Sequence, residues 1–357
     1  MTARRRLQDA PIIDAARGET PSRMPVWFMR QAGRSLPEYR TIREGISMLD
    51  SCFRPDLLSE ITLQPVRRHN VDAAILFSDI VVPLKAAGIG VDIVPGRGPV
   101  MESPVRTKED IVSLAQLDSE VIEISEGITR ILQELRSDQA LIGFAGAPFT
   151  LASYLVEGGP SKNHERTKAL MHAEPELWHQ LMERLVPSIC AFLWTQIDAG
   201  VDAVQLFDSW AGFLSERDYR EFVLPYSRQI FDELRSSNIP RIHFGVGTGE
   251  ILGAMSEAGA EVMGVDWRVP LDQAARRITE ASGPKVLQGN LDPAILQAGT
   301  QVMRQEIARI CEEARRAQAE HTACGHIFNL GHGVLPNTAP EAITEAVEII
   351  HSEGVFH

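Results

Sequence analysis

The strongest constraint on the fold is an alternation of short apolar runs with longer amphipathic segments. Eight apolar runs of strand length lie at residues 26–29, 73–77, 141–145, 203–207, 241–244, 262–265, 285–288 and 326–330. Helix-like stretches cover about 55–69, 119–136, 165–199, 215–235, 248–258, 270–281, 299–320 and 339–352. Strands that alternate with helices pair in parallel through right-handed crossovers. Eight such units predict an α/β fold, a single-domain (β/α)8 TIM barrel with its active site at the C-terminal ends of the strands.

A doubly wound sheet is the alternative α/β fold, but its dinucleotide fingerprint is missing. The nearest candidate, residues 245–250, has Glu250 where the third glycine should stand. No linker rich in Pro, Gly or Ser divides the chain, so we expect a flexible N-terminal segment over 1–20, with room for one short helix near 12–17, and one catalytic domain over 21–357. Residues 80–105 read as a long excursion after the second run, with a small hairpin.

Composition limits the partners. The 357 residues are 44% hydrophobic and 23% charged, which is typical of a globular protein with a sizeable core. The net charge of −13 argues against nucleic acid and against an acidic membrane surface. Local arginines can still hold an anionic small molecule.

The cysteines, at 52, 190, 311 and 324, form no CxxC pair and no closely spaced framework. Free thiols in a reducing cytoplasm are the simplest interpretation. No apolar stretch of signal-peptide length follows the basic N-terminal residues, and no run reaches transmembrane length.

The first apolar run ends directly in an arginine loop. Arg30, Gln31 and Arg34 follow the run around Gly33, and Arg43 lies close behind in the sequence. A guanidinium group is permanently charged and binds a carboxylate or phosphate with two parallel hydrogen bonds. The loop is therefore a candidate anion site, and the alternative is a helix start with solvated arginines.

Polar residues follow the other runs, where a barrel has its chemistry. They are Ser78 and Asp79, Tyr154 one turn after the third run, Asp208, Ser209 and Trp210, Asp266 and Trp267, Asn290 and Asp292, and Asn329 and His332. Each has a plainer interpretation as well. Asp79 and Asp208 can cap a following segment, Tyr154 can be a half-buried core residue, and His332 can be a turn residue.

Six separated motifs give the chain a resemblance to the uroporphyrinogen decarboxylase family. They are residues 25–34 (PVWFMRQAGR), 75–80 (ILFSDI), 143–159 (from GFAGAPFT through Tyr154 to EGG), 205–209 (QLFDS), 288–293 (QGNLDP) and 329–333 (NLGHG). The motifs occur in the family's order, and the match runs from about residue 20 to 352. The resemblance implies a single-domain barrel, a homodimer and no cofactor or metal.

The resemblance also implies an activity and its residues. The family converts the four acetate side chains of uroporphyrinogen III to methyl groups, giving coproporphyrinogen III. Asp79, Arg30 and Tyr154 are then the catalytic candidates. The substrate-binding candidates are Arg30, Gln31, Arg34, Arg43, Asp79, Tyr154, Phe207, Ser209 and His332.

Two departures and two rivals accompany this interpretation. Ser35 stands where the family commonly has Tyr, and Trp210 where several members have His. Zinc methyltransferases of the same superfamily carry a His-x-Cys pair after the fifth strand, but here Phe244 and Gly245 follow His243. A tetrapyrrole-binding carrier without catalysis remains the rival from another class.

Overall fold

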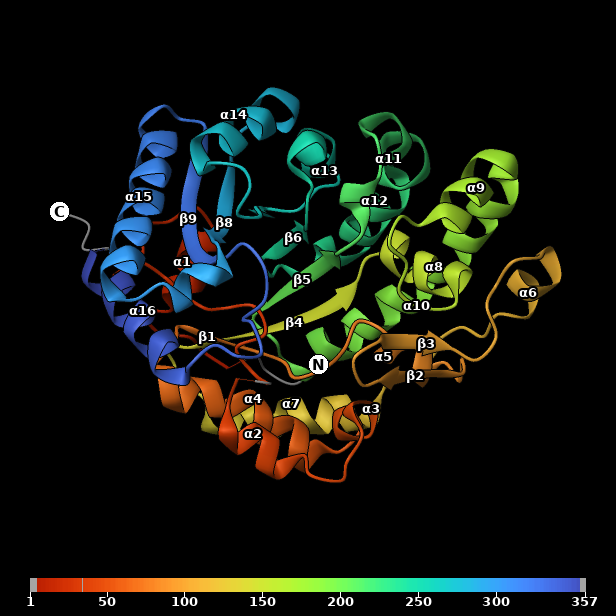
Figure 1. The fold of residues 1–357 in the computed structure, drawn as a ribbon, viewed down its shortest axis with the longest axis horizontal. Helices are drawn as coiled ribbons and strands as arrows, with labels where there is room; N and C mark the ends of the chain where they lie inside the picture. The colour runs from red at the N-terminus through yellow and green to blue at the C-terminus, as the bar shows by residue number, and fades with distance from the viewer. Residues whose placement is uncertain (1–4, 34, 354–357) are drawn as a thin grey trace.

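The computed structural model describes residues 5–33 and 35–353, and its ribbon is drawn in Figure 1. One parallel sheet of seven strands organises the chain. Its order is β1-β4-β5-β6-β7-β8-β9, so neighbouring strands in the sheet follow one another along the chain. A doubly wound sheet reverses its strand order in the middle, and this sheet does not. The strands are β1 (Ala73–Ile75), β4 (Ala140–Gly146), β5 (Ala203–Asp208), β6 (Arg241–Gly245), β7 (Val262–Gly264), β8 (Lys285–Leu291) and β9 (Ala323–Leu330).

Seven of the eight predicted strands are confirmed, but the first is not a ladder strand. Residues 25–31 lie between the two edge strands with one isolated parallel bridge, Val26 to Phe328. On the β9 side, Phe328 N donates to Pro25 O at 2.8 Å, and on the β1 side Asp72 N donates to Val26 O at 2.9 Å. The segment spans the gap between β9 and β1 without forming a regular ladder.

Side chains explain why no regular ladder forms. Their oxygens accept hydrogen bonds from backbone N–H groups that would otherwise donate to a neighbouring strand. The carboxylate of Asp72 accepts from Val26 N at 2.8 Å, and the amide oxygen of Asn329 accepts from Met29 N at 3.0 Å. Gln31 accepts from Phe28 N at 2.8 Å and donates to Ala73 O at 2.8 Å. Buried backbone groups need a partner, and the partner can be a side chain.

Helices surround the sheet (Figure 1). The α-helices are α1 (Pro11–Ala16), α2 (Pro37–Ile42), α3 (Met48–Cys52), α4 (Pro55–His69), α5 (Val82–Ala86), α6 (Lys108–Ser113), α7 (Ile122–Glu134), α8 (Pro148–Glu157), α9 (Glu165–Ala173), α10 (Pro175–Ala199), α11 (Glu216–Phe222), α12 (Leu224–Glu233), α13 (Leu252–Ser256), α14 (Leu271–Ser282), α15 (Thr300–Ala319) and α16 (Pro340–Glu353). Short 3-10 turns are η1 (Ala211–Phe213), η2 (Leu234–Ser237), η3 (Gly249–Ile251) and η4 (Pro293–Gln297).

Proline decides where two long predicted helices divide. The stretch 165–199 is two helices, and the second begins at Pro175; the stretch 215–235 is also two, and Pro225 lies in the first turn of the second. Proline suits a first turn because its missing N–H has no helical partner there. The predicted helix at 55–69 is confirmed as α4, and the predicted hairpin within 80–105 is confirmed as β2 (Val91–Val94) and β3 (Gly98–Met101).

The apolar core has two layers. A large outer cluster lies between the sheet and its helices, whereas a smaller cluster gathers alternate strand residues such as Ile142, Phe144 and Ile242 with Trp27. Helix α1 belongs to the smaller cluster through Ile12, Ile13 and its alanines. The short helix expected near 12–17 is therefore present and packed against the sheet, so the expected looseness of residues 1–20 does not hold for 11–16. Residues 1–4 lie outside the described range.

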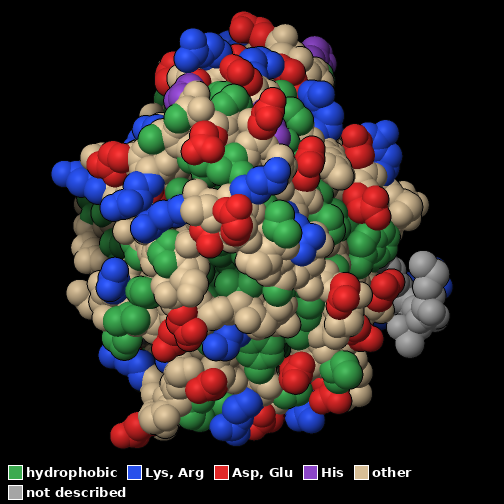
Figure 2. Space-filling model, turned by 90° about the vertical axis from the view of Figure 1, so that its right-hand side faces the viewer, with side chains coloured by type: hydrophobic (Ala, Val, Ile, Leu, Met, Phe, Trp, Pro, Cys, Tyr) green, Lys and Arg blue, Asp and Glu red, His purple; other side chains and the backbone are tan. Residues whose placement is uncertain are grey.

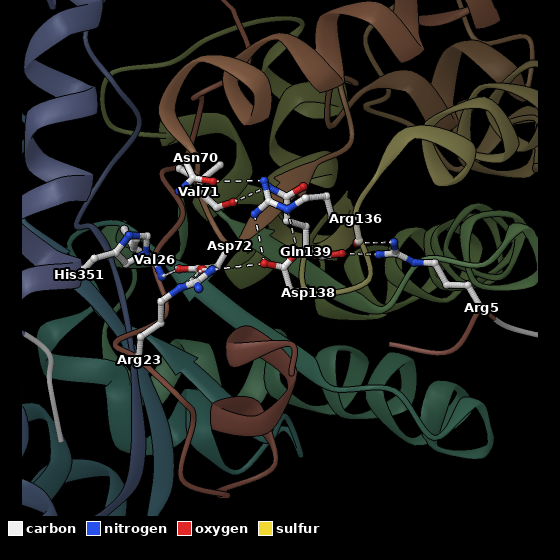
Figure 3. A network of polar contacts seen from close by, with 10 residues as sticks. All are labelled: Arg5, Arg23, Val26, Asn70, Val71, Asp72, Arg136, Asp138, Gln139 and His351. Atoms are coloured by element: carbon white, nitrogen blue, oxygen red, sulfur yellow. Dashed lines mark hydrogen bonds and ion pairs between the residues drawn. The ribbon is translucent and has the colours of Figure 1, made fainter. Parts of the chain in front are cut away.

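A polar network lies where β1 and β4 begin (Figure 3). Asp72 is fully buried and accepts from Arg23 Nη2 at 2.6 Å and from His351 of α16 at 2.9 Å. Near it, Arg136 pairs with Asp138, and Gln139 donates to Val71 O at 3.0 Å. The network joins the N-terminal region, the first strands and the C-terminal helix.

Candidate active site

The arginine loop holds its first guanidinium group on a strained turn. Arg30 has a left-handed backbone, with φ 61°, and an exposed side chain. That conformation costs a residue other than glycine about 1–2 kcal/mol. Flanking hydrogen bonds impose it, from Gln31 N to Phe28 O at 2.9 Å and from Val334 N to Met29 O at 2.8 Å. Strain held by neighbouring structure is typical of functional positions.

The end of β9 provides the surface on which Arg30 lies. A Cβ atom added to Gly333 would overlap the Arg30 side chain, so glycine permits this close approach. The preceding residue, His332, is half-buried, and its ring centroid lies 6.0 Å from that of Trp267. The first and last predicted site segments are thus neighbours in space.

His332 is a neutral hydrogen-bond donor. Burial first, and then the charges of Arg30 and Arg268, lower the pKa of His332. Its Nδ1 accepts from Gly333 N at 2.6 Å. A neutral ring that accepts at Nδ1 carries its proton on Nε2. His332 can therefore offer an N–H to an anionic ligand.

Asp79 follows β1 and is half-buried. Its Oδ1 accepts from Val81 N at 3.1 Å, and its backbone oxygen accepts from Val82 N at 3.1 Å. Both bonds hold the turn that leads into α5, although the N-cap residue of that helix is Val81 and no side chain caps it. Its negative charge also raises the pKa of Tyr154 and of Cys52, so the carboxylate is close enough to act on both side chains.

Tyr154, on α8, is affected by the charges of both Arg30 and Asp79. Burial and then the charge of Asp79 raise the pKa of Tyr154 to about 12, while a hydrogen bond with the Trp210 side chain and the charge of Arg30 act in the opposite direction. A phenol with so high a pKa stays protonated and donates a hydrogen bond. The three predicted catalytic residues thus lie in one electrostatic neighbourhood, formed by the loop after residue 29, the end of β1 and helix α8.

The end of β5 contributes an apolar surface and a hydroxyl group. Phe207 is half-buried, and its ring makes edge contacts with Phe144 at 5.3 Å and Phe244 at 6.0 Å. Ser209 is also half-buried. Asp208 points the other way, toward the helices, and is fully buried, because side chains alternate between the two faces of a strand.

Two other predicted ligands have structural contacts. Gln31 is fully buried, and its side-chain amide accepts from Phe28 N and donates to Ala73 O. Arg43 is half-buried; its Nη1 donates to Tyr39 Oη, and its Nη2 donates to Ile46 O at 3.2 Å. Arg43 and Asp79 both act on Cys52, so Arg43 lies near the Asp79 side of the site. Arg34 lies outside the described residues.

Sequence reasoning missed Arg268. Its guanidinium group lies 3.9 Å from the centroid of the Trp267 ring, and its Nη1 is 2.6 Å from Asp266 Oδ2. The side chain is half exposed and close enough to affect His332. Its place directly after β7 and the Asp-Trp pair was the available signal.

The described residues contain no cluster of three or more His, Cys, Asp or Glu side chains arranged to hold a metal ion. Within the same ranges, no helix has the length and apolar character needed to cross a membrane. On the face drawn in Figure 2, acidic and basic side chains are interspersed among apolar ones.

Fold and site together define a class: a parallel α/β protein that gathers cations, a carboxylate and neutral donors at the carboxyl ends of its strands. A model of the uroporphyrinogen decarboxylase (URO-D) family matches residues 7–353. Uroporphyrinogen decarboxylase of Corynebacterium efficiens is 74% identical over 349 residues, covering 98% of this chain and 97% of that protein. Those of Corynebacterium diphtheriae and Rhodococcus erythropolis are 75% identical over 342 residues (96% and 98% covered) and 65% identical over 353 residues (98% and 98%). The chain belongs to the uroporphyrinogen decarboxylase family.

A solved structure, a methyltransferase from Methanosarcina mazei, shares the fold. Its TM-score is 0.80 at 17% identity, and the match covers 98% of this chain and 99% of that one. At so low an identity the likeness concerns architecture alone. A methyltransferase can thus share this architecture, so the fold alone does not specify an activity.

Proposed function

We propose that this chain performs the reaction of its family, the decarboxylation of uroporphyrinogen to coproporphyrinogen, and that it does so without a cofactor on all four acetate arms of the III isomer. The observation that carries the site assignment is the pKa of Tyr154, on which Asp79 and Arg30 act with opposite signs. A carboxylate and a guanidinium group are thus both close enough to act on one buried, protonated phenol.

The proposed architecture is a barrel completed by its first segment. Residues 25–31 would complete the barrel wall as its eighth segment, since they form hydrogen bonds with β9 on one side and with the segment that begins β1 on the other. In this view residues 21–357 form one catalytic domain. The site then opens at the carboxyl ends of the seven strands and of this eighth segment.

Several groups would hold the carboxylates of the substrate. Arg30 and Arg34 would bind acetate or propionate groups through paired hydrogen bonds. Tyr154, Ser209 and the Nε2–H of His332 would donate to further carboxylates, and Phe207 would offer an apolar face to a pyrrole ring. Gln31 would act by holding the arginine loop against β1 through its bond to Ala73 O, and Arg43 by holding the segment after α2 through its bond to Ile46 O.

The chemistry requires an electron sink, and the pyrrole ring can be its own. A proton added to a ring carbon makes the pyrrole cationic. The C–C bond to the acetate carboxylate then breaks, CO2 leaves, and the bonding electrons neutralise the ring as an exocyclic methylene. A proton on that methylene gives the methyl group, and loss of the first proton restores the pyrrole. Each arm thus exchanges one CO2 for one proton.

Asp79 would stabilise the cationic ring. Its carboxylate can accept pyrrole N–H bonds and offset the developing positive charge. Val81 N already fixes one oxygen of the group at 3.1 Å, which orients the other. A charge fixed in place before the reaction costs no reorganisation at the transition state. The candidate acids for protonating the ring carbon are an Arg30-bound water, Arg30 itself and a substrate carboxyl.

Asp79→Asn tests the assignment. Asparagine keeps the size and the capping oxygen but removes the charge, so turnover should fall by on the order of a hundredfold while affinity for the product coproporphyrinogen changes far less. Asp110, which caps α6, gives the matched control, and Asp110→Asn should leave turnover intact. Near-normal turnover in Asp79→Asn would leave the residue with a capping role only.

Substrate turnover also separates the enzyme from a tetrapyrrole carrier. Anaerobic incubation with uroporphyrinogen should yield intermediates with seven, six and five carboxyls and then the four-carboxyl product. A chelator should not lower the rate. The zinc enzymes have a cysteine two residues after this histidine, whereas here Gly245 stands two residues after His243. Stoichiometric zinc that is lost together with activity would favour the methyltransferase chemistry instead.

The proposed setting is a homodimer in the cytoplasm. Cys52, Cys190, Cys311 and Cys324 are free thiols, which suits a reducing compartment. Light scattering on the purified protein would give the oligomeric state.

A further inference from the structure

A buried polar pair lies behind the end of β5, on its helix-facing side. Asp208 and His243 are both fully buried, and Asp208 Oδ2 is 3.9 Å from His243 Nε2. Neither of these two atoms has a hydrogen-bond partner among the described residues. Buried polar atoms are nearly always bonded, so a pair that faces each other in this way requires an explanation.

Both groups can be neutral at the pH of the cytoplasm. Burial raises the pKa of Asp208 to about 7, although its hydrogen bond from Thr150 opposes the shift, and burial lowers the pKa of His243 to about 4. A protonated Asp208 would carry its proton on Oδ2, toward the acceptor nitrogen of His243. Tyr219 of α11 is the other titratable neighbour, and burial, followed by the charge of Asp208 in its ionised form, raises the pKa of Tyr219.

The second oxygen of Asp208 connects the pair to the active site. Thr150, on α8, donates its hydroxyl proton to Asp208 Oδ1 at 2.9 Å. The same hydroxyl oxygen accepts from Trp210 N at 3.2 Å. A hydroxyl group has one proton, so the bond to Asp208 fixes its orientation and leaves a lone pair for Trp210.

Trp210, held by its bond to Thr150, in turn contacts Tyr154. The two rings meet edge to face with centroids 5.9 Å apart, and the Trp210 side chain is close enough to the phenol to lower its pKa. Thr150 and Tyr154 are also four residues apart on α8, which places them on one face of the helix. The phenol is therefore held both through its helix and through Trp210.

We propose that Asp208 is a positioning residue for the decarboxylation: through the Thr150 hydroxyl it fixes Trp210, and with it the Tyr154 hydroxyl that meets the substrate. Asp208 itself points away from the substrate and takes no part in the chemistry. The inference rests on the proposed role of Tyr154. It assigns Trp210 a supporting place in the site and explains why a threonine and an aspartate are buried here.

Thr150→Val tests the proposal, because valine keeps the shape of threonine but loses both hydrogen bonds. We expect kcat/KM to fall about tenfold, since small displacements of a positioning group are costly to the reaction rate. Thr150→Ser, which keeps the hydroxyl, should restore kcat/KM to within about threefold of the unmodified protein. Thr195→Val is the matched control, because the Thr195 hydroxyl on α10 also donates one hydrogen bond and accepts another, in this case both with backbone groups.

Asp208 gives an independent pair of variants. Asp208→Asn keeps an oxygen that can accept from Thr150, so its kcat/KM should resemble that of Thr150→Ser. Asp208→Ala should resemble Thr150→Val, and the double variant Thr150→Val/Asp208→Ala should lose little more than either alone. If Asp208→Ala does not fold, the threonine series still decides.

The proposal is overturned if Thr150→Val matches Thr195→Val in kcat/KM, whatever its thermal stability. The role of Tyr154 fails on a different result, namely full turnover in Tyr154→Phe. A folded Thr150→Val with lost turnover and a fully active Tyr154→Phe would place the effect of Asp208 on Trp210 and Ser209 rather than on the phenol. The two failures are therefore distinguishable.

Discussion

Arg30 shows how one residue can combine strain with function. Its left-handed backbone turns the chain away from the first segment, its side chain packs against Gly333, and its charge acts on His332 and Tyr154. Few core contacts depend on the exposed guanidinium group. Substitution of Arg30 should therefore remove a charge from the site without disturbing the packing of the core.

Arg30→Ala should fold normally and lose turnover by roughly ten- to a hundredfold, the value of one charge-assisted hydrogen bond of about 1.5–3 kcal/mol. Steady-state kinetics and circular dichroism on the same sample measure both properties. Arg17, an exposed arginine that ends α1, is the control, and Arg17→Ala should keep full activity. A misfolded Arg30→Ala protein would instead give Arg30 a structural role.

At the scale of elements, the first segment depends on side chains from elsewhere in the sequence. Asp72, Gln31 and Asn329 each accept a backbone N–H that a ladder partner would otherwise take. Two of these three residues are distant in sequence from the segment that they hold. The segment keeps its place between β9 and β1 because these bonds form together.

Asp72→Ala should therefore destabilise the fold by about 3–5 kcal/mol, the usual cost of breaking a buried charged pair. The change leaves Arg23, Val26 N and His351 without their shared acceptor (Figure 3). Urea unfolding gives the free energy. Asp138→Ala, in the more exposed pair with Arg136, should cost less than about 1 kcal/mol. Equal losses in the two variants would contradict the importance given to burial.

At the scale of the whole molecule, buried histidines set the response to acid. Burial is the main cause that lowers the pKa of His69, His243 and His326 to about 4 each. Between pH 6.5 and 4 the unfolded chain binds these protons and the folded chain does not, so each histidine destabilises the fold by roughly 3 kcal/mol at most as pH falls through this window. Asp208, with its pKa raised to about 7, opposes this trend, because its folded form holds a proton that the unfolded form releases.

The destabilising effect of the three histidines should exceed the opposing effect of Asp208. We therefore expect a net loss of folding stability as the pH falls from 6.5 to 4. Urea midpoints across this range measure it. His326 donates to Gly289 O at 2.7 Å, and glutamine can keep that bond without titrating, so His326→Gln should flatten the dependence. A midpoint that stays level or rises toward pH 4 in the unmodified protein would contradict the prediction.

The sequence by itself determined the alternation of seven strands with helices, the hairpin after β1 and the family. These depend on local signals: runs of apolar residues, prolines at helix starts, and motifs of adjacent residues. It also named Arg30, Asp79, Tyr154 and His332, because parallel strands end at one edge of a sheet and the residues that follow them must meet there.

Only the tertiary structure decided which of the named side chains reach that edge. Gln31 turns inward to backbone groups, Asp208 faces the helices, and Arg268, which lies outside the six motifs, is close enough to act on His332. The first apolar run is not a regular strand, because side chains from residues 72 and 329 take its N–H groups. Such outcomes depend on contacts between residues 42 to 300 positions apart, and no local pattern in the chain encodes them.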